Sequence, residues 1–428
     1  MEKSGLSIKI ILITAFAMFS MMFGGGNFIL PPLLGLQAGN AWPIVCISFG
    51  ISGVFIPLLG ILTQAKTQGT IIEMGTKIHP IFGLVLGVLM YVICLSFPIP
   101  RTAAVTYELA VQGYITISSF WFSIIYFSLV SYLCFNRNKI LDILGKYLTP
   151  LLLSIIVLII IKAVFFIHDT PQNSLLERPF KSGLLEGYQT FDGIASIIIG
   201  GVIVSSLNMT NMLDYKQKKR LIIFAGIISS LALFAIYSGF IYTGAALSDV
   251  FPNDITRTEL LSGIGTHTLG IFGGTLLSIS VSIACFTTAV GIIAGAADFM
   301  KYLFKGSLKV YNITVIGACL LGIVVGKTGT ENIISVAVPV LVLIYPIVIM
   351  LIFLNIVPAK YTSKSIFRMV IITSLLFAIP DFLASLQVDI SDIQSLLFLS
   401  DYNLAWLIPS LVVWIIGLGF KVRQVNYP

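Results

Sequence analysis

Long runs of apolar residues, separated by short polar segments, dominate the chain from end to end. A helix needs about 20 mostly apolar residues to cross the hydrocarbon layer of a membrane. Membrane-spanning helices are predicted at residues 8–34, 42–63, 81–110, 120–135, 148–167, 183–207, 221–246, 270–299, 310–326, 333–356, 369–386 and 404–420. The polar gaps between them are too short for a soluble domain. We therefore expect residues 1–428 to form one all-α integral membrane domain of about twelve helices.

Composition agrees with this pattern, because 57% of the residues are hydrophobic and only 10% are charged. A soluble domain has about 25% charged residues. The first apolar run, 8–34, is too long for a cleaved signal peptide and ends in Pro31 and Pro32, so we interpret it as a retained helix. The five cysteines lie scattered inside apolar segments, which is typical of buried packing.

The net charge of +7 is distributed unevenly between alternate loops. Of the 25 Lys and Arg residues, 19 fall in the two terminal segments and in the loops on the same side as them, and only 4 in the opposite loops. Basic loops stay in the cytoplasm, so both termini are predicted to be cytoplasmic and the number of spans to be even. This asymmetry explains the basic charge, and we expect no nucleic-acid partner.

The first predicted span contains an interruption near its expected middle. Gly24, Gly25 and Gly26 stand in succession and are followed by Asn27. Each glycine costs about 1 kcal/mol relative to alanine in a helix interior. Small residues also allow close packing between membrane helices, but packing typically uses glycines four apart on one face. We therefore expect an unwound segment here.

The sixth span contains a polar stretch at 187–193 that includes Asp192. An acidic residue costs at least ~2.5 kcal/mol near the membrane centre on insertion scales. Asp192 can cap a helix near the outer surface, line a cavity at a second helix break, or do both.

The two predicted breaks are five spans apart, and spans one and six start from opposite sides of the membrane. This indicates two five-helix repeats of opposite topology, at 8–167 and 183–356, followed by two accessory helices at 369–420. Broken helices at matching positions are typical of transporter binding sites. The N-terminal end of a half-helix favours a carboxylate, whereas unwound carbonyl groups favour a small cation.

Polar residues in two other spans are further candidates. Thr287 and Thr288 in the eighth span offer hydroxyls for a Na⁺ shell, although threonine in a membrane helix usually bonds its own backbone. Arg101 and Glu108 in the third span lie seven residues apart, on one helix face. Each needs a polar partner in the membrane, so a gate and a structural ion pair are both open.

Other classes of membrane protein fit less well. A channel needs a continuous polar pore, and polar residues do not recur on one face of the spans. A membrane enzyme needs clustered reactive side chains inside the spans, and the sequence has none. A transporter with its binding site at the two helix breaks is the function that the pattern favours.

Several blocks of sequence match a known family. They are FGGGNFILPPLLGLQAG at 23–39, PRTAAVTYE at 100–108, EGYQTFDG at 186–193, ACFTTAVG at 284–291, SVAVPVL at 335–341 and AWLIP at 405–409. They resemble the BrnQ-type branched-chain amino acid:cation symporters, within the amino acid–polyamine–organocation superfamily. The resemblance covers essentially the whole chain.

The resemblance implies a LeuT-like fold with a 5+5 inverted repeat and breaks in helices one and six. It also implies uptake of L-leucine, L-isoleucine and L-valine with sodium as the coupling ion and without a cofactor. The location would be the plasma membrane of a bacterium. Proton coupling, or exchange of small apolar amino acids, with Asp192 or Glu108 titrating, is the alternative.

The resemblance further assigns roles to residues. Gly24, Gly25, Gly26 and Asn27 resemble the segment whose backbone holds the substrate carboxylate. Thr190, Phe191, Asp192 and Gly193 resemble the segment that meets the substrate amine and side chain. The sodium site would use the carbonyls of Ser20, Phe23 and Ala284 with the hydroxyls of Thr287 and Thr288. Many members have methionine where this chain has Phe191, which would narrow the side-chain pocket.

Overall fold

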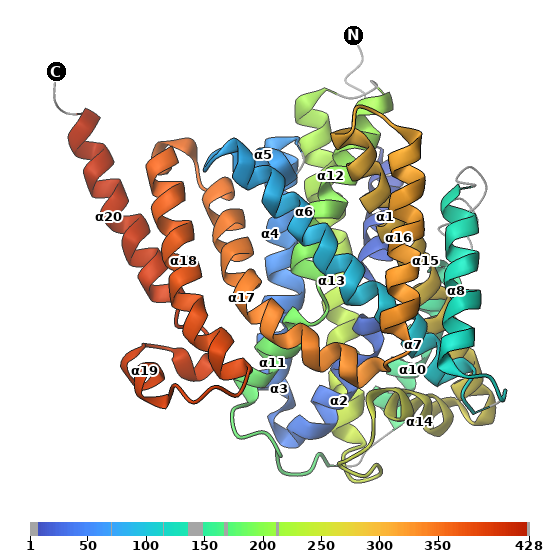
Figure 1. Ribbon diagram of the computed structural model, residues 1–428. Coiled ribbons are helices and arrows are strands. Elements are labelled where there is room, and N and C mark those ends of the chain that lie inside the picture. The colour runs from blue at the N-terminus through green and yellow to red at the C-terminus, as the bar shows by residue number, and fades with distance from the viewer. Residues whose placement is uncertain are drawn as a thin grey trace.

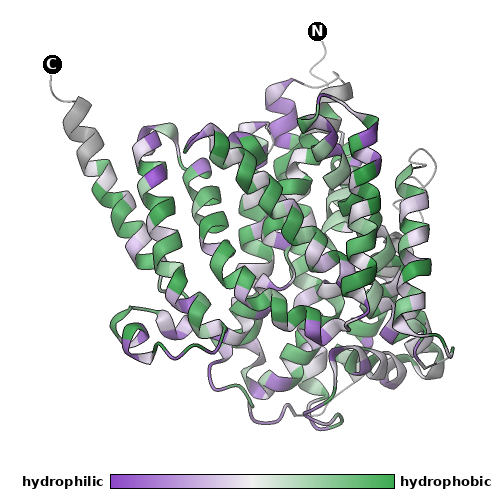
Figure 2. Ribbon diagram, viewed as in Figure 1, coloured by the Kyte–Doolittle hydropathy of each residue, from purple (hydrophilic) through white to green (hydrophobic). Residues whose placement is uncertain are grey.

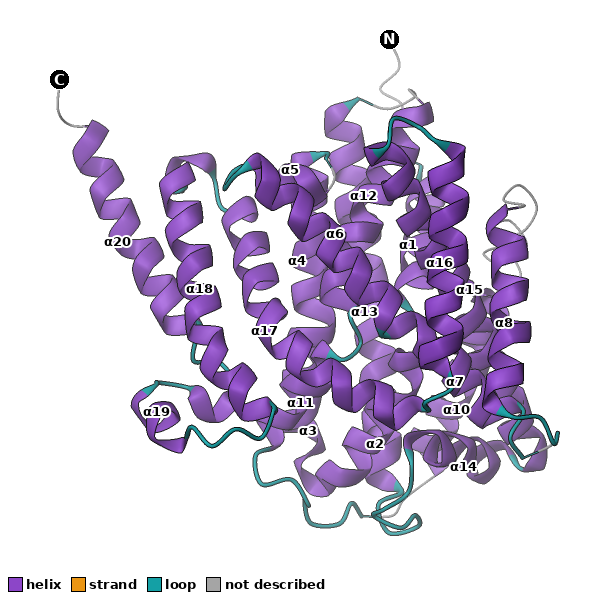
Figure 3. Ribbon diagram, viewed as in Figure 1, coloured by secondary structure: helices purple, strands orange, loops and turns teal. Residues whose placement is uncertain are grey.

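The protein is a bundle of helices whose long axes run broadly side by side (Figure 1). The computed structural model describes residues 7–69, 71–113, 115–135, 149–166, 170–210 and 214–425. Every regular element in these ranges is a helix, as Figure 3 shows by colour. The predicted all-α class is therefore confirmed.

Each predicted span coincides with one helix or with consecutive helices. In chain order these are α1 (Ile8–Met22) and α2 (Gly25–Ala38); α3 (Trp42–Gly50), the π-helical η2 (Ile51–Phe55) and α4 (Ile56–Thr67); α6 (Pro80–Ser96) and α7 (Pro98–Ala110); α8 (Ser119–Phe135); α10 (Thr149–Phe166); α11 (Pro179–Tyr188) and α12 (Asp192–Thr210); α13 (Tyr215–Ala246); α15 (Ile271–Leu303); α16 (Leu308–Gly326); α17 (Thr330–Ile356); α18 (Lys364–Ser385); and α20 (Leu407–Val425).

Eight helical segments in the described residues are long and apolar enough to cross a membrane. Shorter apolar helices accompany them at Ile8–Met22, Ser119–Phe135, Leu153–Phe165 and Leu407–Gly419. The described residues thus form a multi-pass membrane protein, whereas the number of twelve crossings stays a prediction because these four helices are short for a span. The central parts of the helices are mostly hydrophobic, and many hydrophilic residues lie near the two ends of the bundle (Figure 2).

Large apolar side chains on the outside of the bundle support the membrane assignment. Trp121 on α8, Leu158 on α10 and Ile313 on α16 are all exposed. Extended apolar surface of this kind is unusual on a soluble monomer and marks a face that meets lipid or another protein.

Further short helices lie between the spans, and the apolar pattern did not predict them. They are η1 (Gly39–Ala41), α5 (Ile71–Thr76), α14 (Arg257–Leu269), η4 (Ala359–Tyr361), α19 (Ser391–Leu396) and η5 (Ser400–Tyr402). In Figure 1, α1 begins and α20 ends on one side of the bundle, whereas α14 and α19 lie on the opposite side. We call these sides the termini face and the α14 face.

Helix α2 packs against α13 with backbone in direct contact. A Cβ atom on Gly35 would lie 1.9 Å from the carbonyl oxygen of Ile241, and one on Gly244 would lie 2.0 Å from that of Pro32. Only glycine permits this approach, which is a common device in membrane helix packing. The helix continues through Pro31 and Pro32 to Ala38, past the predicted end of the first span at 34.

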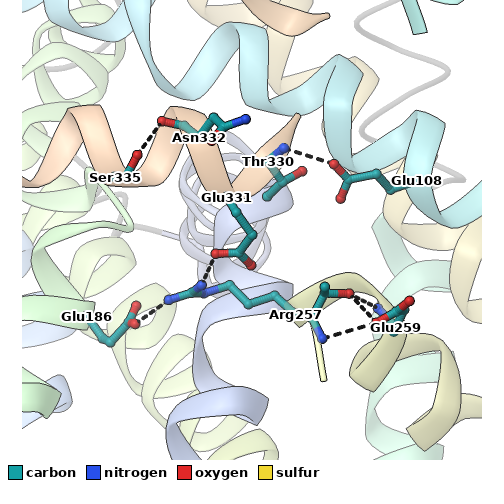
Figure 4. A network of polar contacts seen from close by, with 9 residues as sticks. Glu108, Glu186, Arg257, Glu259, Thr330, Glu331, Asn332 and Ser335 are labelled. Carbon is teal, nitrogen blue, oxygen red and sulfur yellow. Dashed lines mark hydrogen bonds and ion pairs between the residues drawn. The ribbon is translucent and has the colours of Figure 1, made fainter. Parts of the chain in front are cut away.

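Both ends of α17 are held by side chains from other helices. At the termini face, the ammonium group of Lys66 on α4 donates hydrogen bonds to the carbonyls of Asn355, Ile356 and Val357 at 2.8–2.9 Å. A cation at a helix C-terminus satisfies its unpaired carbonyls and complements its dipole. At the α14 face, Glu108 on α7 accepts a hydrogen bond from the backbone N–H of Thr330 at 2.8 Å (Figure 4).

Candidate functional site

The first span is broken between α1 and α2, as predicted. Helix α1 ends at Met22, Phe23 has extended backbone angles, and Gly24 precedes the first turn of α2. The side-chain oxygen of Asn27 accepts a hydrogen bond from the Gly24 N–H at 3.1 Å. The break therefore covers Phe23 and Gly24, whereas Gly25 and Gly26 are already helical.

Each of the three glycines faces a side chain from another helix. A Cβ atom on Gly24 would lie 3.0 Å from the hydroxyl oxygen of Thr288, and one on Gly25 would lie 2.5 Å from the sulfur of Cys285. A Cβ atom on Gly26 would lie 2.1 Å from Nη2 of Arg101. The run thus combines the expected break with close packing against two helices, α15 and α7, and this explains why the glycines are consecutive.

The sixth span is broken between α11 and α12, also as predicted. The Thr190 hydroxyl donates to the carbonyl of Gly187 at 2.9 Å and accepts the Asp192 N–H at 3.2 Å. Phe191 has a φ of 63°, a left-handed conformation that costs a side-chain-bearing residue roughly 1–2 kcal/mol. Gly193 follows in the first turn of α12 and packs against the ring of Tyr345.

A buried polar cluster joins the two breaks. Asn27 donates through Nδ2 to Oδ2 of Asp192 at 2.8 Å, and the Tyr237 hydroxyl donates to the same oxygen at 2.8 Å. Asn27 also donates to the Tyr237 hydroxyl. Asp192 is only 1% exposed, and its carboxylate accepts hydrogen bonds from both of these residues. The cluster therefore connects α2, α12 and the unbroken α13.

Arg101 also contacts both breaks, from α7. It is 3% exposed, and its Nη1 donates to the backbone carbonyl of Gln189 at 3.0 Å. Its guanidinium carbon lies 5.6 Å from the centre of the Phe191 ring, within the range of a cation–π contact. Glu108, two turns along the same helix, instead bonds the N-terminus of α17. The structure thus gives these two predicted residues different partners.

The predicted cation ligands lie around the first break. Ser20 lies in the last turn of α1, Phe23 lies in the break itself, and Ala284, Thr287 and Thr288 share α15. The Thr287 hydroxyl donates to the Ala284 carbonyl at 2.9 Å, which is the local bond that threonine commonly makes. The Thr288 hydroxyl oxygen is buried against Gly24 and has no hydrogen-bond partner among the described residues.

The site brings together groups that suit a zwitterion. Helices α2 and α12 both begin at the breaks, so the positive ends of two helix dipoles lie there, where a carboxylate is favoured. The carboxylate of Asp192 offers the opposite charge. Tyr237 is the member that the sequence did not reveal, because a tyrosine within an apolar span is typical of packing.

The family model for "Branched-chain amino acid transport protein" matches residues 7–423. The branched-chain amino acid permease BraB of Bacillus subtilis is 31% identical over 434 residues, which cover 97% of this chain and 96% of the relative. A putative branched-chain amino acid carrier protein of Staphylococcus epidermidis is 33% identical over 444 residues, with 97% of each chain covered.

Solved structures with the same fold are more distant in sequence. MhsT in complex with L-phenylalanine aligns with a TM-score of 0.58 at 17% identity, covering 98% of this chain and 99% of that one. The inward-facing conformation of Mhp1 gives 0.60 at 13% identity, covering 96% and 90%. These similarities confirm the predicted LeuT-like fold. The whole-length match to the family model, together with the curated relatives, shows that the chain belongs to the branched-chain amino acid transport protein family.

Proposed function

We propose that this protein imports leucine, isoleucine and valine across the bacterial plasma membrane, coupled to sodium, by alternating access. The family supports branched-chain amino acids as substrates. The observation that supports the site is the convergence of both helix breaks on Asn27, Tyr237 and Asp192. A substrate carboxylate would bind the N-termini of α2 and α12, and the amine would bind beside Asp192.

The sodium site is proposed between α1 and α15. The unpartnered Thr288 hydroxyl at Gly24 supports this location, because a buried hydroxyl without a partner is costly unless a ligand or water satisfies it. The carbonyls of Ser20, Phe23 and Ala284 and the hydroxyl of Thr287 would complete an oxygen shell, which is what a small hard cation requires. Sodium bound there would hold the first break in the shape that receives the substrate.

Proton coupling is the second candidate, and Asp192 favours it. Asp192 is buried and accepts hydrogen bonds from the neutral side chains of Asn27 and Tyr237, while the nearest positive charge, Arg101, bonds the Gln189 carbonyl at the same break. A carboxyl group in such surroundings is costly to keep charged and is a suitable proton carrier. If protons drive uptake, a proton gradient alone should drive leucine accumulation, and Asp192→Asn should abolish that accumulation.

The proposed coupling is tested with labelled L-leucine uptake into proteoliposomes under an inward sodium gradient, a proton gradient, or neither. We expect accumulation only with sodium, and competition by isoleucine and valine. Replacing both Thr287 and Thr288 with alanine should weaken apparent sodium affinity at least roughly tenfold, equivalent to about 1.4 kcal/mol.

Thr314→Ala is the matched control for the threonine variant. The Thr314 hydroxyl also bonds its own helix, donating to the Val310 carbonyl at 2.8 Å, but it belongs to α16 rather than α15. Sodium activation should be unchanged in this control. Unaltered sodium activation in the double variant would contradict the proposed ion site. Uptake driven by protons alone would favour proton coupling through Asp192.

A further inference from the structure

A cluster of three charged side chains joins three helices at the α14 face, apart from the site at the breaks (Figure 4). Arg257 is the first residue of α14, and its Nη2 lies 2.7 Å from Oε1 of Glu186 on α11. Its Nη1 forms a second ion pair with Glu331, in the first turn of α17. We call Arg257, Glu186 and Glu331 the Arg257 cluster.

The Arg257 cluster is partly withdrawn from solvent. The side chains of Arg257 and Glu186 are 13% and 16% exposed, whereas that of Glu331 is 48% exposed. Burial lowers the pKa of the Arg257 guanidinium, but the two carboxylates outweigh burial and raise its pKa above the ordinary value. Two half-buried ion pairs to one guanidinium are stronger than the isolated surface pairs that contribute little.

The start of α14 is fixed independently of the Arg257 cluster. The Thr256 hydroxyl donates to the Glu259 carboxylate at 2.7 Å, and that carboxylate also accepts the Thr256 N–H at 3.1 Å. This is a capping box, in which the side chains at the ends of the first turn bond each other's backbone. Glu259 is thereby bonded to Thr256, whereas the side chain of Arg257 extends toward α11 and α17.

A short series of contacts leads from the Arg257 cluster to the helix breaks. Glu186 is three residues before Gln189, whose carbonyl accepts a hydrogen bond from Arg101. Arg101 in turn lies against Gly26 and the ring of Phe191. Arg257 therefore holds α11 on the α14 side of the second break, and through Glu331 it also holds the start of α17.

We propose that Arg257 is a gating residue: its ion pairs to Glu186 and Glu331 close the α14 face over the broken helices and must separate before that face opens. This inference rests on the proposed function, because only a transporter needs such an opening. Movement of α11 and α17 away from α14 would uncover the breaks from this side. Loss of Arg257 should then favour the state open to the α14 face.

Cys285 provides a native reporter of that opening. Its sulfur is buried at the first break, against Gly25. In a background with Cys46, Cys94, Cys134 and Cys319 replaced by serine or alanine, the rate of its reaction with a membrane-impermeant maleimide measures access to the break. Ser395→Cys, on the exposed surface of α19, identifies the preparation, intact cells or inside-out vesicles, in which the reagent reaches the α14 face.

In that preparation, Arg257→Gln and Glu331→Gln should each raise the labelling rate of Cys285 roughly tenfold, within the usual range of conformational coupling. Arg257→Lys keeps the positive charge but lacks the two guanidinium nitrogens that pair with separate carboxylates, so it should raise the labelling rate less. Glu331→Gln changes a half-exposed side chain and so tests the inference even if Arg257→Gln does not fold.

Arg178→Gln is the matched control. Arg178 pairs with Asp401 at 2.6 Å on the same face, but its side chain is 47% exposed and that of Asp401 is 66% exposed. Arg178 precedes the first turn of α11, and this pair links α11 to neither α14 nor α17. Its loss should leave Cys285 labelling unchanged. Labelling at the parent rate in both the Arg257 and Glu331 variants would overturn the inference. Because labelling needs no substrate, raised labelling without leucine uptake would contradict the proposed function alone.

Discussion

At the scale of single residues, Tyr237 matters through its hydrogen bonds to Asp192 and Asn27. Its hydroxyl donates to the Asp192 carboxylate at 2.8 Å and is itself bonded by Asn27. Tyr237 therefore positions one residue from each broken helix, although it stands on an unbroken one. Because a hydrogen bond to a buried charged group is worth more than a neutral one, its removal should be felt at the site.

Tyr237→Phe should reduce apparent affinity for leucine roughly tenfold, since a hydrogen bond to a charged group contributes about 1.5–3 kcal/mol. The measurement is concentration-dependent leucine uptake in proteoliposomes. Tyr311→Phe is the control, because the Tyr311 hydroxyl makes a buried bond of 2.9 Å to the Cys134 carbonyl between α16 and α8. Equal losses of affinity in both variants would reduce Tyr237 to a general packing role.

Single residues also show how far the sequence could lead. Asp192 stood out because an acid is rare within an apolar span. Arg257 did not, because in a polar loop it counted only as one of the few basic residues of the opposite side. Its significance comes from Glu186 and Glu331, which are 71 and 74 residues away in sequence and meet it only in the fold. Such long-range pairing leaves no local signal.

At the scale of helices, composition located both breaks but not their extent. A run of glycines lowers helix propensity wherever it occurs, so the first break was predictable. The helix restarts at Gly25, however, because the last two glycines meet Cys285 and Arg101 in tight packing instead of unwinding. The short helix α14 was not predicted, because it is not an apolar span and the apolar pattern indicates only the spans.

The crossing of α2 and α13 supports a prediction about stability. Gly35→Ala would place a methyl group against the backbone of α13, where the nearest atom is a carbonyl oxygen that cannot move aside. Overpacking of this kind costs roughly 1–3 kcal/mol, so the apparent melting temperature in detergent should fall by several degrees.

Gly317→Ala is the matched control for this helix-packing prediction, because a Cβ atom there would have no heavy atom within 4 Å. Alanine is favoured over glycine in a helix by about 1 kcal/mol, so its melting temperature should be equal or slightly higher. Similar destabilisation by both substitutions would mean that the loss of stability is not specific to the crossing of α2 and α13 and does not come from the close approach of their backbones.

At the scale of the whole molecule, α17 connects the two faces. Lys66 holds its C-terminal end at the termini face, and Glu108 and Arg257 hold its N-terminal end at the α14 face. Two prolines, Pro339 and Pro346, lie within the continuous helix between these attachments. Proline removes a backbone hydrogen bond and permits bending, so these are the two positions at which α17 is most easily bent. This arrangement suits a protein that opens its two faces in turn.

The charge distribution predicts which face meets the cytoplasm, and this prediction can be tested on the intact molecule. The basic residues favour a cytoplasmic termini face, because Lys and Arg near the ends of spans are retained inside the cell. Lys305 lies in the exposed turn between α15 and α16, on the termini face, and Ser395 lies on α19, on the α14 face. A cysteine is introduced at each position in turn, as Lys305→Cys and Ser395→Cys. In intact cells an impermeant maleimide should label Ser395→Cys and should reach Lys305→Cys only after the membrane is permeabilised. The reverse pattern would place the termini outside the cell. The α14 face would then be cytoplasmic. In that case the Arg257 cluster would control release of the substrate into the cell instead of its entry from outside.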